Sequence, residues 1–464
     1  EWCTTTMGIG NGRDLTLIRE LRFPHSIGLL YSAFTAFLGF EINEGEYKVM
    51  GLAAYGVPKY IDWVWQVVQQ ADDGAFRLTP GYFSFHYSTK HSYTRKFEKL
   101  FGQPRDSSIQ FFTKGAEFAK GLSAKPDNFD QLCQYNQYYA DIAASIQMVT
   151  EGLIVNLANQ AYHQTGSKNL CLAGGVALNS VANARIWQET PFDQLYIQPS
   201  AGDGGGALGA ALALWHQELK KERSVPLIDK MQGSYLGPSF SNDEIQEALT
   251  SLGATFKKLP EEELLKITAL ELSKEKTIGW FQGRMEFGPR ALGSRSIIAD
   301  PRSEKMQKNL NLKVKFRESF RPFAPSVIRE EVSKWFNLDC DSPYMLLVTN
   351  VKDNIKREMT KEETKLFGIE KLNIKRSNIP AVTHIDYSAR IQTVHKDTNL
   401  KYYKLIKNFE KITDCPIIVN TSFNIRGEPI VCSIKDAYSC FMGTDLDMLV
   451  CGDFILYKKK QNKQ

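Results

Sequence analysis

The chain lacks the sequence marks of a secreted, membrane-spanning or cysteine-rich protein. Its eight cysteines are scattered and form no Cys-x-x-Cys pair, which disfavours a zinc site or a disulfide framework and fits free thiols in a reducing compartment. The longest apolar run, Ile27 to Phe40, has 14 residues, whereas a bilayer span needs about 20. We therefore interpret it as a buried core helix. No secretory signal is visible, so we expect a cytoplasmic protein without a membrane partner.

The chain also lacks a strong excess of charge. It has 57 Lys and Arg residues against 52 Asp and Glu, a net charge of +5. Nucleic acid is therefore an unlikely partner for the surface as a whole, and any basic site must be local. The hydrophobic share of 43% and the charged share of 23% are ordinary for a folded protein.

The order of patterns along the chain predicts two α/β domains. In residues 1–225, strand, glycine turn and helix alternate. Residues 226–240 are polar, contain Pro and Gly, and predict a linker. Residues 241–464 mix strand-like and helical runs. Within them, the charged segment Val351 to Ser377 predicts a solvated insertion or a helical excursion, and the tail from Lys458 predicts a frayed terminus.

Two glycine turns mark the first domain. Gly174 and Gly175 separate a strand from a helix in "LAGGVALN", and "SAGDGGGALGAA" adds Asp203 to the same plan. Glycine lets a ligand approach the backbone, and the amides at a helix start attract anions. The alternative is a pair of packing turns with Asp203 as a helix N-cap. Two such turns within about thirty residues favour nucleotide binding, although the GxGxxG pattern of dinucleotide sites is missing.

Arginines are concentrated in "FQGRMEFGPRALGSRSIIADPR", which runs from Phe281 to Arg302. Between Gly283 and Arg321 there are ten Lys and Arg residues against four Asp and Glu. Guanidinium groups match phosphate geometry, and the small residues around Arg290 leave room for a ligand. A compact phosphate pocket is the favoured interpretation. A solvated basic face is one alternative. The other is a single-strand RNA patch using the interleaved Phe287, Phe316, Phe320 and Phe323.

Two further runs place polar groups on strands. "IIVNTSFNIRGEPIV" ends an apolar strand in a bunch of polar residues, a common way to line a site. "THIDYSARIQTV" puts polar residues at alternate positions, which predicts that they share one strand face, lining a site or facing solvent. These alternating residues are His384, Asp386, Ser388, Arg390 and Gln392.

Together, "AGGVALN", "SAGDGGGALGAAL", "GRMEFGPRALGSRSIIADPR", "KFRESFRPFAPS" and "VNTSFNIRGEPIV" resemble the NodU/CmcH-type O-carbamoyltransferases of nodulation factors and antibiotics. The resemblance covers nearly the whole chain, in order. It implies a partial actin-like ATPase (ASKHA, TsaD-like) domain followed by a YrdC-like domain. It also implies an ATP-dependent enzyme that makes carbamoyl-adenylate from carbamoyl phosphate and ATP. The carbamoyl group would then pass to a hydroxyl of a sugar or secondary metabolite.

The resemblance also implies roles for particular residues. The carbamoyl-phosphate clamp would be formed by Arg290, Lys315 and Arg321. Further contacts with carbamoyl phosphate and nucleotide would come from Arg390, Ser422 and Asn424. The adenylate wall in the first domain would be Gly174, Gly175, Val176 and Asn179. Asp203 would ligate Fe(2+), and ATP would be bound with Mg(2+). The acceptor, the base for its hydroxyl and the oligomeric state are not predicted.

The chain departs from the family pattern at its front. It begins "EWCTTTMGIG", and no two of its seven histidines are four residues apart, whereas the family has a His-x-x-x-His pair. We therefore expect an N-terminally truncated chain with an incomplete iron site, in which apolar surface such as Ile27 to Phe40 is left uncovered. The alternative function is an RNA-binding or tRNA-modifying YrdC-like protein. The hydrogenase-maturation relatives are disfavoured because Cys-x-x-Cys pairs are missing.

Overall fold

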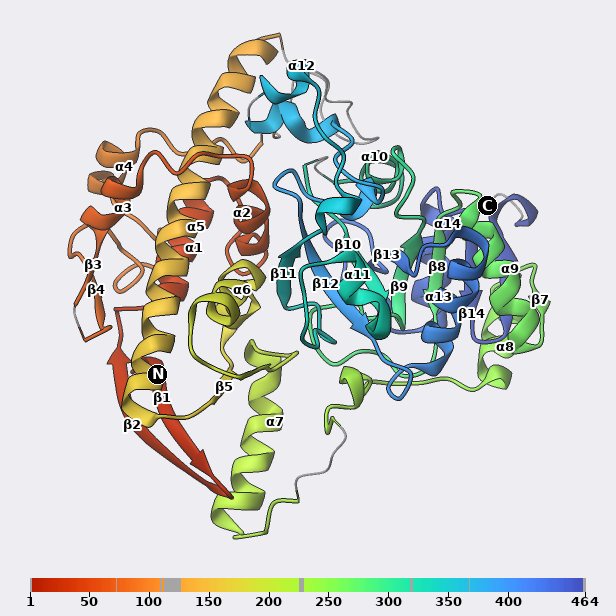
Figure 1. Cartoon of the computed structure of the whole chain (residues 1–464), viewed down its shortest axis with the longest axis horizontal. Coiled ribbons are helices and arrows are strands. Elements are labelled where there is room, and N and C mark those ends of the chain that lie inside the picture. The colour runs from red at the N-terminus through yellow and green to blue at the C-terminus, as the bar shows by residue number, and fades with distance from the viewer. Residues whose placement is uncertain are drawn as a thin grey trace. The chain divides into compact units, whose positions relative to one another are not determined.

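The computed structural model describes residues 2–71, 73–108, 111, 127–224, 229–317, 320–366 and 368–461. The backbone divides into two compact units (Figure 1). The first contains Glu1–Gly115, Asp127–Pro226 and Leu366–Leu372, and the second contains Leu227–Lys365 and Asn373–Gln464. Both units mix helices and strands, as the sequence predicts.

The first unit is built around one long helix, α5, of 37 residues. Helices α1, α2, α3 and α6 pack against it. Its strands form small two-stranded sheets, antiparallel for β1–β2 and β3–β4 and parallel for β5–β6. The elements of this unit are β1 (Cys3–Asn11), β2 (Asp14–Arg22), α1 (Ile27–Phe37), α2 (Glu46–Ala53), α3 (Ile61–Val67), β3 (Val68–Gln70), β4 (Phe76–Leu78), α4 (Arg95–Phe101), α5 (Phe129–Thr165), β5 (Asn169–Leu172), α6 (Ser180–Glu189), β6 (Gln194–Ile197) and α7 (Asp203–Ala213).

The apolar run at residues 27–40 forms the buried helix that the sequence predicts. Phe34 and Phe37 of α1 are fully buried and contact Phe97 and Phe101 of α4 edge to face. The expectation that this surface would be uncovered is wrong, because α4 and α5 cover it. Exposed apolar side chains lie instead on β2 and just after α7, for example Leu17, which is 62% exposed.

The second unit contains a large mixed sheet. Its described strands run in the order β11-β12-β10-β13-β9-β8-β14-β15-β7. Helix α9 packs against α13, which contacts β10 and β13, while α14 contacts β8, β14 and α8. The elements are α8 (Asn242–Ser251), β7 (Lys257–Lys258), α9 (Glu261–Ser273), β8 (Ile278–Phe281), β9 (Arg295–Ala299), α10 (Met306–Asn309), β10 (Ala324–Ile328), α11 (Val332–Trp335), β11 (Leu347–Asn350), α12 (Lys361–Thr364), β12 (Ser388–Val394), α13 (Leu400–Thr413), β13 (Ile417–Ser422), α14 (Ile434–Gly443), β14 (Met448–Cys451) and β15 (Phe454–Tyr457).

Two predictions about polar segments need correction. The tail is not frayed at residues 458–461, because Lys458 Nζ donates to three carbonyl oxygens at and just beyond the end of α14, and Gln461 is buried. The rest of the predicted frayed tail, 462–464, lies outside the described residues. The charged segment at 351–377 is not simply solvated either, since Arg376 and Ser377 are buried.

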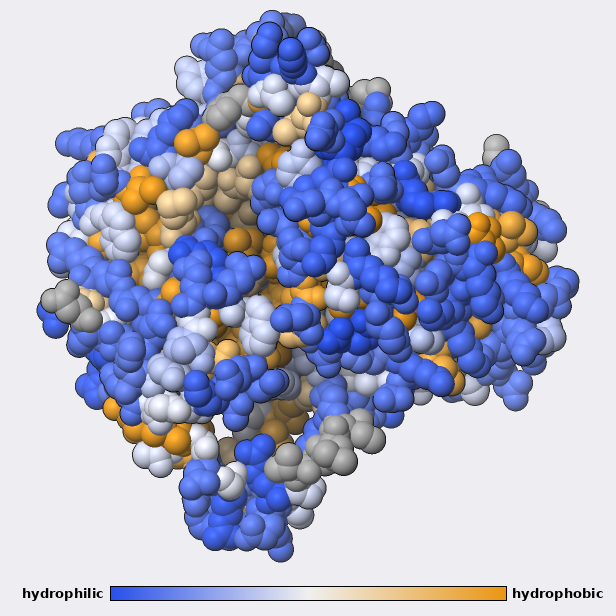
Figure 2. All heavy atoms as spheres, viewed as in Figure 1, coloured by the Kyte–Doolittle hydropathy of each residue, from blue (hydrophilic) through white to orange (hydrophobic). Residues whose placement is uncertain are grey.

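Hydrophilic residues cover most of the face shown in Figure 2. Within the described part of the chain, no helix combines the length and apolar character needed to cross a bilayer.

Candidate active site

Lys315 lies at the centre of the basic stretch and is buried. It follows η4 (Leu310–Val314), a π-helical turn that continues α10. Its Nζ donates to the carbonyl oxygen and Oγ of Ser422, at 2.8 and 3.2 Å. It also donates to the carbonyl oxygen and Oδ1 of Asn424, at 2.8 and 2.5 Å. These four acceptors are neutral, so they fix the ammonium group without cancelling its charge.

Arginines from separate segments add their charge to this neighbourhood. Burial lowers the pKa of Lys315 well below its usual range, and the charges of Arg317 and Arg321 lower it further. Burial likewise lowers the pKa of Arg390 on β12, and the charges of Arg290 and Arg321 add to the effect. The charge of Arg321 acts on both groups, so Arg290, Lys315, Arg321 and Arg390 are linked through the effects of their charges. We call these four residues the cation cluster. Such a gathering of like charge favours the binding of an anion.

A buried asparagine fixes the turn that carries two members of the cation cluster. Asn311 in η4 is fully buried. Its Oδ1 accepts from Arg317 Nε at 2.7 Å, and its Nδ2 donates to the carbonyl oxygen of Arg321 at 3.0 Å. The Arg317 guanidinium also lies over the ring of Phe323, 4.6 Å from its centre. Asn311 therefore links Arg317, two residues after Lys315, to the backbone of Arg321.

The four arginines of the stretch at 281–302 have different roles. Arg284 Nη2 donates to a backbone carbonyl oxygen at 2.8 Å, and Arg302 pairs with Asp300 at 2.6 Å. Arg295 is fully buried in the protein. Only Arg290 of the four contributes to the cation cluster, as far as the described residues show.

Arg295 and Glu286 brace the loop between β8 and β9. Glu286 Oε1 accepts from the backbone amides of Leu292, Ser294 and Arg295, and burial raises the pKa of this carboxyl. The Arg295 guanidinium lies 3.6 Å from the centre of the Phe281 ring. Its Nη1 and Nη2 donate to the carbonyl oxygens of Gln282, Gly283, Ser294 and Pro238. Both side chains thus shape the loop that carries Arg290.

The alternating polar residues at 384–392 share one strand face only in part. Strand β12 begins at Ser388, so Ser388, Arg390 and Gln392 alternate along it. His384 and Asp386 lie in the turn before the strand, where their side chains approach to 3.7 Å. The prediction of a single face is therefore wrong for these two residues.

The glycine turns of the first unit meet at one edge of a sheet. Strands β5 and β6 are parallel, so both turns follow the carboxyl ends of their strands, where ligands commonly bind in α/β proteins. Gly174 has φ +97°, a region that favours glycine, and its amide donates to the carbonyl oxygen of Ala201 at 2.7 Å. Gly174 and Gly175 are exposed, and Val176 is half-buried.

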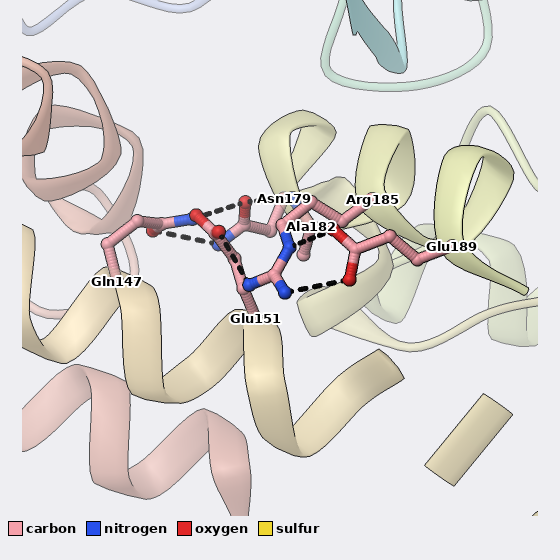
Figure 3. Close-up of polar contacts among 6 residues, drawn as sticks. All are labelled: Gln147, Glu151, Asn179, Ala182, Arg185 and Glu189. Atoms are coloured by element: carbon pink, nitrogen blue, oxygen red, sulfur yellow. Dashed lines mark hydrogen bonds and ion pairs between the residues drawn. The ribbon is translucent and has the colours of Figure 1, made fainter. Parts of the chain in front are cut away.

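A polar cluster lies behind the first turn (Figure 3). Asn179 Oδ1 accepts from Gln147 Nε2 and from the backbone amide of Ala182, both at 3.1 Å, so it caps α6. Its Nδ2 donates to Gln147 Oε1 at 3.1 Å. Gln147 Nε2 also donates to Glu151, which Arg185 contacts at 3.2 Å. Burial raises the pKa of Glu151 against the opposing effect of these two donors. The cluster anchors Asn179, and with it the start of α6, to helix α5.

Two models of one family match the chain, described as Carbamoyltransferase N-terminus over residues 1–212 and Carbamoyltransferase C-terminus over residues 269–458. The nodulation protein NolO of Bradyrhizobium diazoefficiens is 34% identical over 100% of this chain, which covers 75% of NolO. The chain belongs to the carbamoyltransferase family.

Of two other relatives of this carbamoyltransferase, one is uncharacterized and one matches a smaller part of the chain. An uncharacterized protein of Synechocystis sp., sll1178, is 52% identical over 99% of the chain and 72% of its own length. Nodulation protein U of Sinorhizobium fredii is 31% identical over 69% of the chain and 50% of its own length. The solved structure of full-length HypF, in its phosphate- and nucleotide-bound form, covers 44% of this chain and 22% of its own at a TM-score of 0.28 and 16% identity. That likeness is too weak to bear on the fold.

Asp203 is the predicted iron ligand of the carbamoyltransferase. It is exposed at the first position of α7, and Gly202 is the N-cap, so the interpretation of Asp203 as an N-cap is wrong. Among the described residues, no three His, Cys, Asp or Glu side chains come together as a metal site would require. These residues do not by themselves fit an iron centre, and Asp203 stays a single predicted ligand.

Sequence reasoning missed the residues that hold the cation cluster of the carbamoyltransferase in place. Asn311, Glu286 and Asn420 are buried polar residues. The available signal was Asn311, which lies between two leucines in "NLNLKV", and Asn420, which follows three apolar residues in "IIVNTS". A polar residue that interrupts an apolar run must be hydrogen-bonded inside the protein.

Proposed function

We propose that this carbamoyltransferase forms carbamoyl-adenylate from carbamoyl phosphate and ATP in its second unit and transfers the carbamoyl group in its first. The observation that carries the proposal is the cation cluster, in which the charges of four basic side chains from three segments act on one another. In this proposal the second unit is YrdC-like, and the first is part of an actin-like ATPase fold.

The cation cluster suits a small phosphate ester. Each charge-assisted hydrogen bond contributes about 1.5–3 kcal/mol net, so three or four converging donors are enough to hold carbamoyl phosphate. Arg290, Arg321 and Arg390 would bind phosphate oxygens with paired donors. Lys315, held by Ser422 and Asn424, would add a point charge.

The proposed steps balance with one water molecule. Water releases phosphate from carbamoyl phosphate and leaves carbamate. A carbamate oxygen then attacks the α-phosphorus of ATP and expels pyrophosphate, giving carbamoyl-adenylate. The cation cluster would stabilise the charge that develops on the phosphate oxygens.

The glycine turns are the proposed site of the second half-reaction. The exposed amides after Gly174 would face the adenylate phosphate, as helix starts commonly do. A hydroxyl of a sugar or secondary metabolite would attack the carbamoyl carbon, and AMP would leave. The adenylate would bind at Gly174, Gly175, Val176 and Asn179.

The test of the first half-reaction is ATP–pyrophosphate exchange that depends on carbamoyl phosphate. We expect exchange when carbamoyl phosphate is present and none when it is omitted. Single-strand RNA binding is the competing function, but Phe320 and Phe323 are buried and cannot stack on bases. A protein that shows no exchange but binds RNA tightly and with strong salt dependence would overturn the proposal.

The depressed pKa of Lys315 predicts a pH dependence for anion binding. The charged form binds the anion, and in the folded protein this lysine loses its proton below the usual value near 10.4. We expect the Kd of inorganic phosphate to rise about tenfold per pH unit above the pKa of Lys315. The free energy of unfolding of the ligand-free protein should rise with pH up to about 10.4, whereas its affinity for phosphate falls. In this pH range the unfolded chain still binds the proton that Lys315 of the folded protein has lost, so a higher pH favours the folded protein.

Titration calorimetry with phosphate between about pH 8 and pH 10, alongside Lys315→Met, measures this dependence. The variant should bind phosphate weakly and with little change over this range. A wild-type affinity that stays constant up to pH 10 would contradict the prediction.

A further inference from the structure

A pair of buried amides spans the centre of the sheet in the second unit. Asn420 on β13 and Gln392 on β12 are 1% and 2% exposed. Strand β10 lies between their two strands (Figure 1), yet Asn420 Nδ2 reaches Gln392 Oε1 at 2.8 Å. Ser326 on β10 also donates to Gln392 Oε1, at 2.5 Å, and Tyr402 donates to Ser326 at 3.0 Å. Because Gln392 Oε1 accepts two hydrogen bonds, the orientation of its amide is fixed.

The remaining donors of the pair bind the loop that carries Arg290. Asn420 Nδ2 donates to the carbonyl oxygen of Ala291 at 3.1 Å, and Gln392 Nε2 donates to the carbonyl oxygen of Leu292 at 2.6 Å. These two carbonyl groups directly follow Arg290 in the chain. The amide pair therefore holds the backbone next to one arginine of the cation cluster.

The same two residues are linked through their strands to the rest of the cation cluster. Gln392 lies two positions after Arg390 on β12, so the two share a strand face. Asn420 lies two positions before Ser422 on β13, and Ser422 accepts from Lys315. The amide pair is therefore connected to three segments: the loop that carries Arg290, strand β12 that carries Arg390, and strand β13 that binds Lys315.

An asparagine side chain at position 420 would lower the stability of the fold if its role were purely structural. Its Oδ1 has no hydrogen-bond partner among the residues that the structure describes, although buried polar atoms are almost always paired. A leucine at this position of the apolar strand β13 would avoid that penalty. The benefit of asparagine here lies in its two donated hydrogen bonds, to Ala291 and Gln392.

We propose that Asn420 and Gln392 are positioning residues that set the placement of Arg290 relative to Arg390 and Lys315. The inference rests on the proposed function in that the cation cluster binds the phosphate of carbamoyl phosphate. A misplacement of about 1 Å in a catalytic site costs roughly 100-fold in rate. We therefore expect Asn420→Leu to lower kcat/KM for carbamoyl-phosphate-dependent exchange by about 10- to 100-fold while the protein stays folded.

The experiment is a double-variant cycle with inorganic phosphate as the binding probe and exchange as the activity. If Asn420 acts through Arg290, the Asn420→Leu, Arg290→Lys double variant should be little worse than Arg290→Lys alone. Asn420→Leu combined with Arg284→Lys should instead be additive. Gln461→Met is the matched control, because Gln461 is a buried amide of the same unit that donates to Thr255 and Tyr457. It should lose stability and keep phosphate affinity.

The outcomes separate this inference from the proposed function. A wild-type protein that neither binds phosphate nor catalyses exchange would refute the proposed function. A wild type that does both, with Asn420→Leu binding phosphate and catalysing exchange equally well, would refute the positioning role alone. Additive effects of Asn420→Leu and Arg290→Lys would also refute it. If Asn420→Leu does not fold, Gln392→Met tests the same pair with the same expected result.

Discussion

Arg290→Lys is expected to reduce carbamoyl-phosphate-dependent exchange roughly 100-fold while leaving the fold intact. A lysine keeps the charge but loses the planar fork that binds two phosphate oxygens at once. Two charge-assisted hydrogen bonds at the lower end of their range contribute about 3 kcal/mol, which corresponds to about 100-fold. Arg321→Lys should have a similar effect, because the Arg321 charge acts on both Lys315 and Arg390.

Arg284→Lys is the matched control for this prediction. Arg284 lies in the same arginine-rich stretch, but it is exposed and its Nη2 donates to the carbonyl oxygen of Leu236. The control variant should keep nearly full exchange activity. The measurement is the KM for carbamoyl phosphate, together with phosphate affinity by calorimetry. Unchanged values in both Arg290→Lys and Arg321→Lys would place the phosphate site elsewhere.

Arg295→Met is expected to destabilise the second unit by about 3–5 kcal/mol. Arg295 is fully buried and donates to four carbonyl oxygens, which the variant would leave without these donors. The charge of the buried Glu286 also raises the pKa of Arg295 against the effect of burial, so the variant removes a cation that lies near this carboxyl group.

Urea unfolding followed by circular dichroism measures this loss. Arg284→Met, which removes an exposed arginine, should change the free energy of unfolding by only about 0.5–1.5 kcal/mol, the value of one hydrogen bond. A loss of less than about 1 kcal/mol in Arg295→Met would show that the carbonyl groups find other donors. Together with Arg290→Lys, the result would separate an arginine that binds ligand from one that holds the loop.

The residue pattern alone indicated a local basic site but did not distinguish its arginines, and only the family resemblance singled out Arg290. Arg290 and Arg295 have similar neighbours along the chain, so the local pattern favours phosphate binding by both guanidinium groups equally. They differ because Arg295 is the first residue of β9 and packs on Phe281 of the adjacent strand. That difference depends on which strands pair, and pairing is a non-local property.

The two glycine turns were predictable from the alternation of strand, glycine turn and helix. Their place at one edge follows from the parallel pairing of β5 and β6, which the structure shows. The role of Asn179 as the cap of α6 was not predictable in the same way. Its partner Gln147 lies 32 residues earlier on α5, and helical periodicity says nothing about which residue of a second helix it contacts. The local sequence pattern does not predict hydrogen bonds between segments that are far apart in the chain.

The strand order of the large sheet has a consequence for how the protein is made on the ribosome. Strands β14 and β15, near the end of the chain, lie between β8 and β7, two early strands of the unit. Until residues 448–457 have left the ribosome, β8 and β7 each expose an unpaired edge, and such edges are prone to association with other chains. A premature stop before Met448 would therefore leave β8 with an unpaired edge and would remove β15, the strand with which β7 pairs.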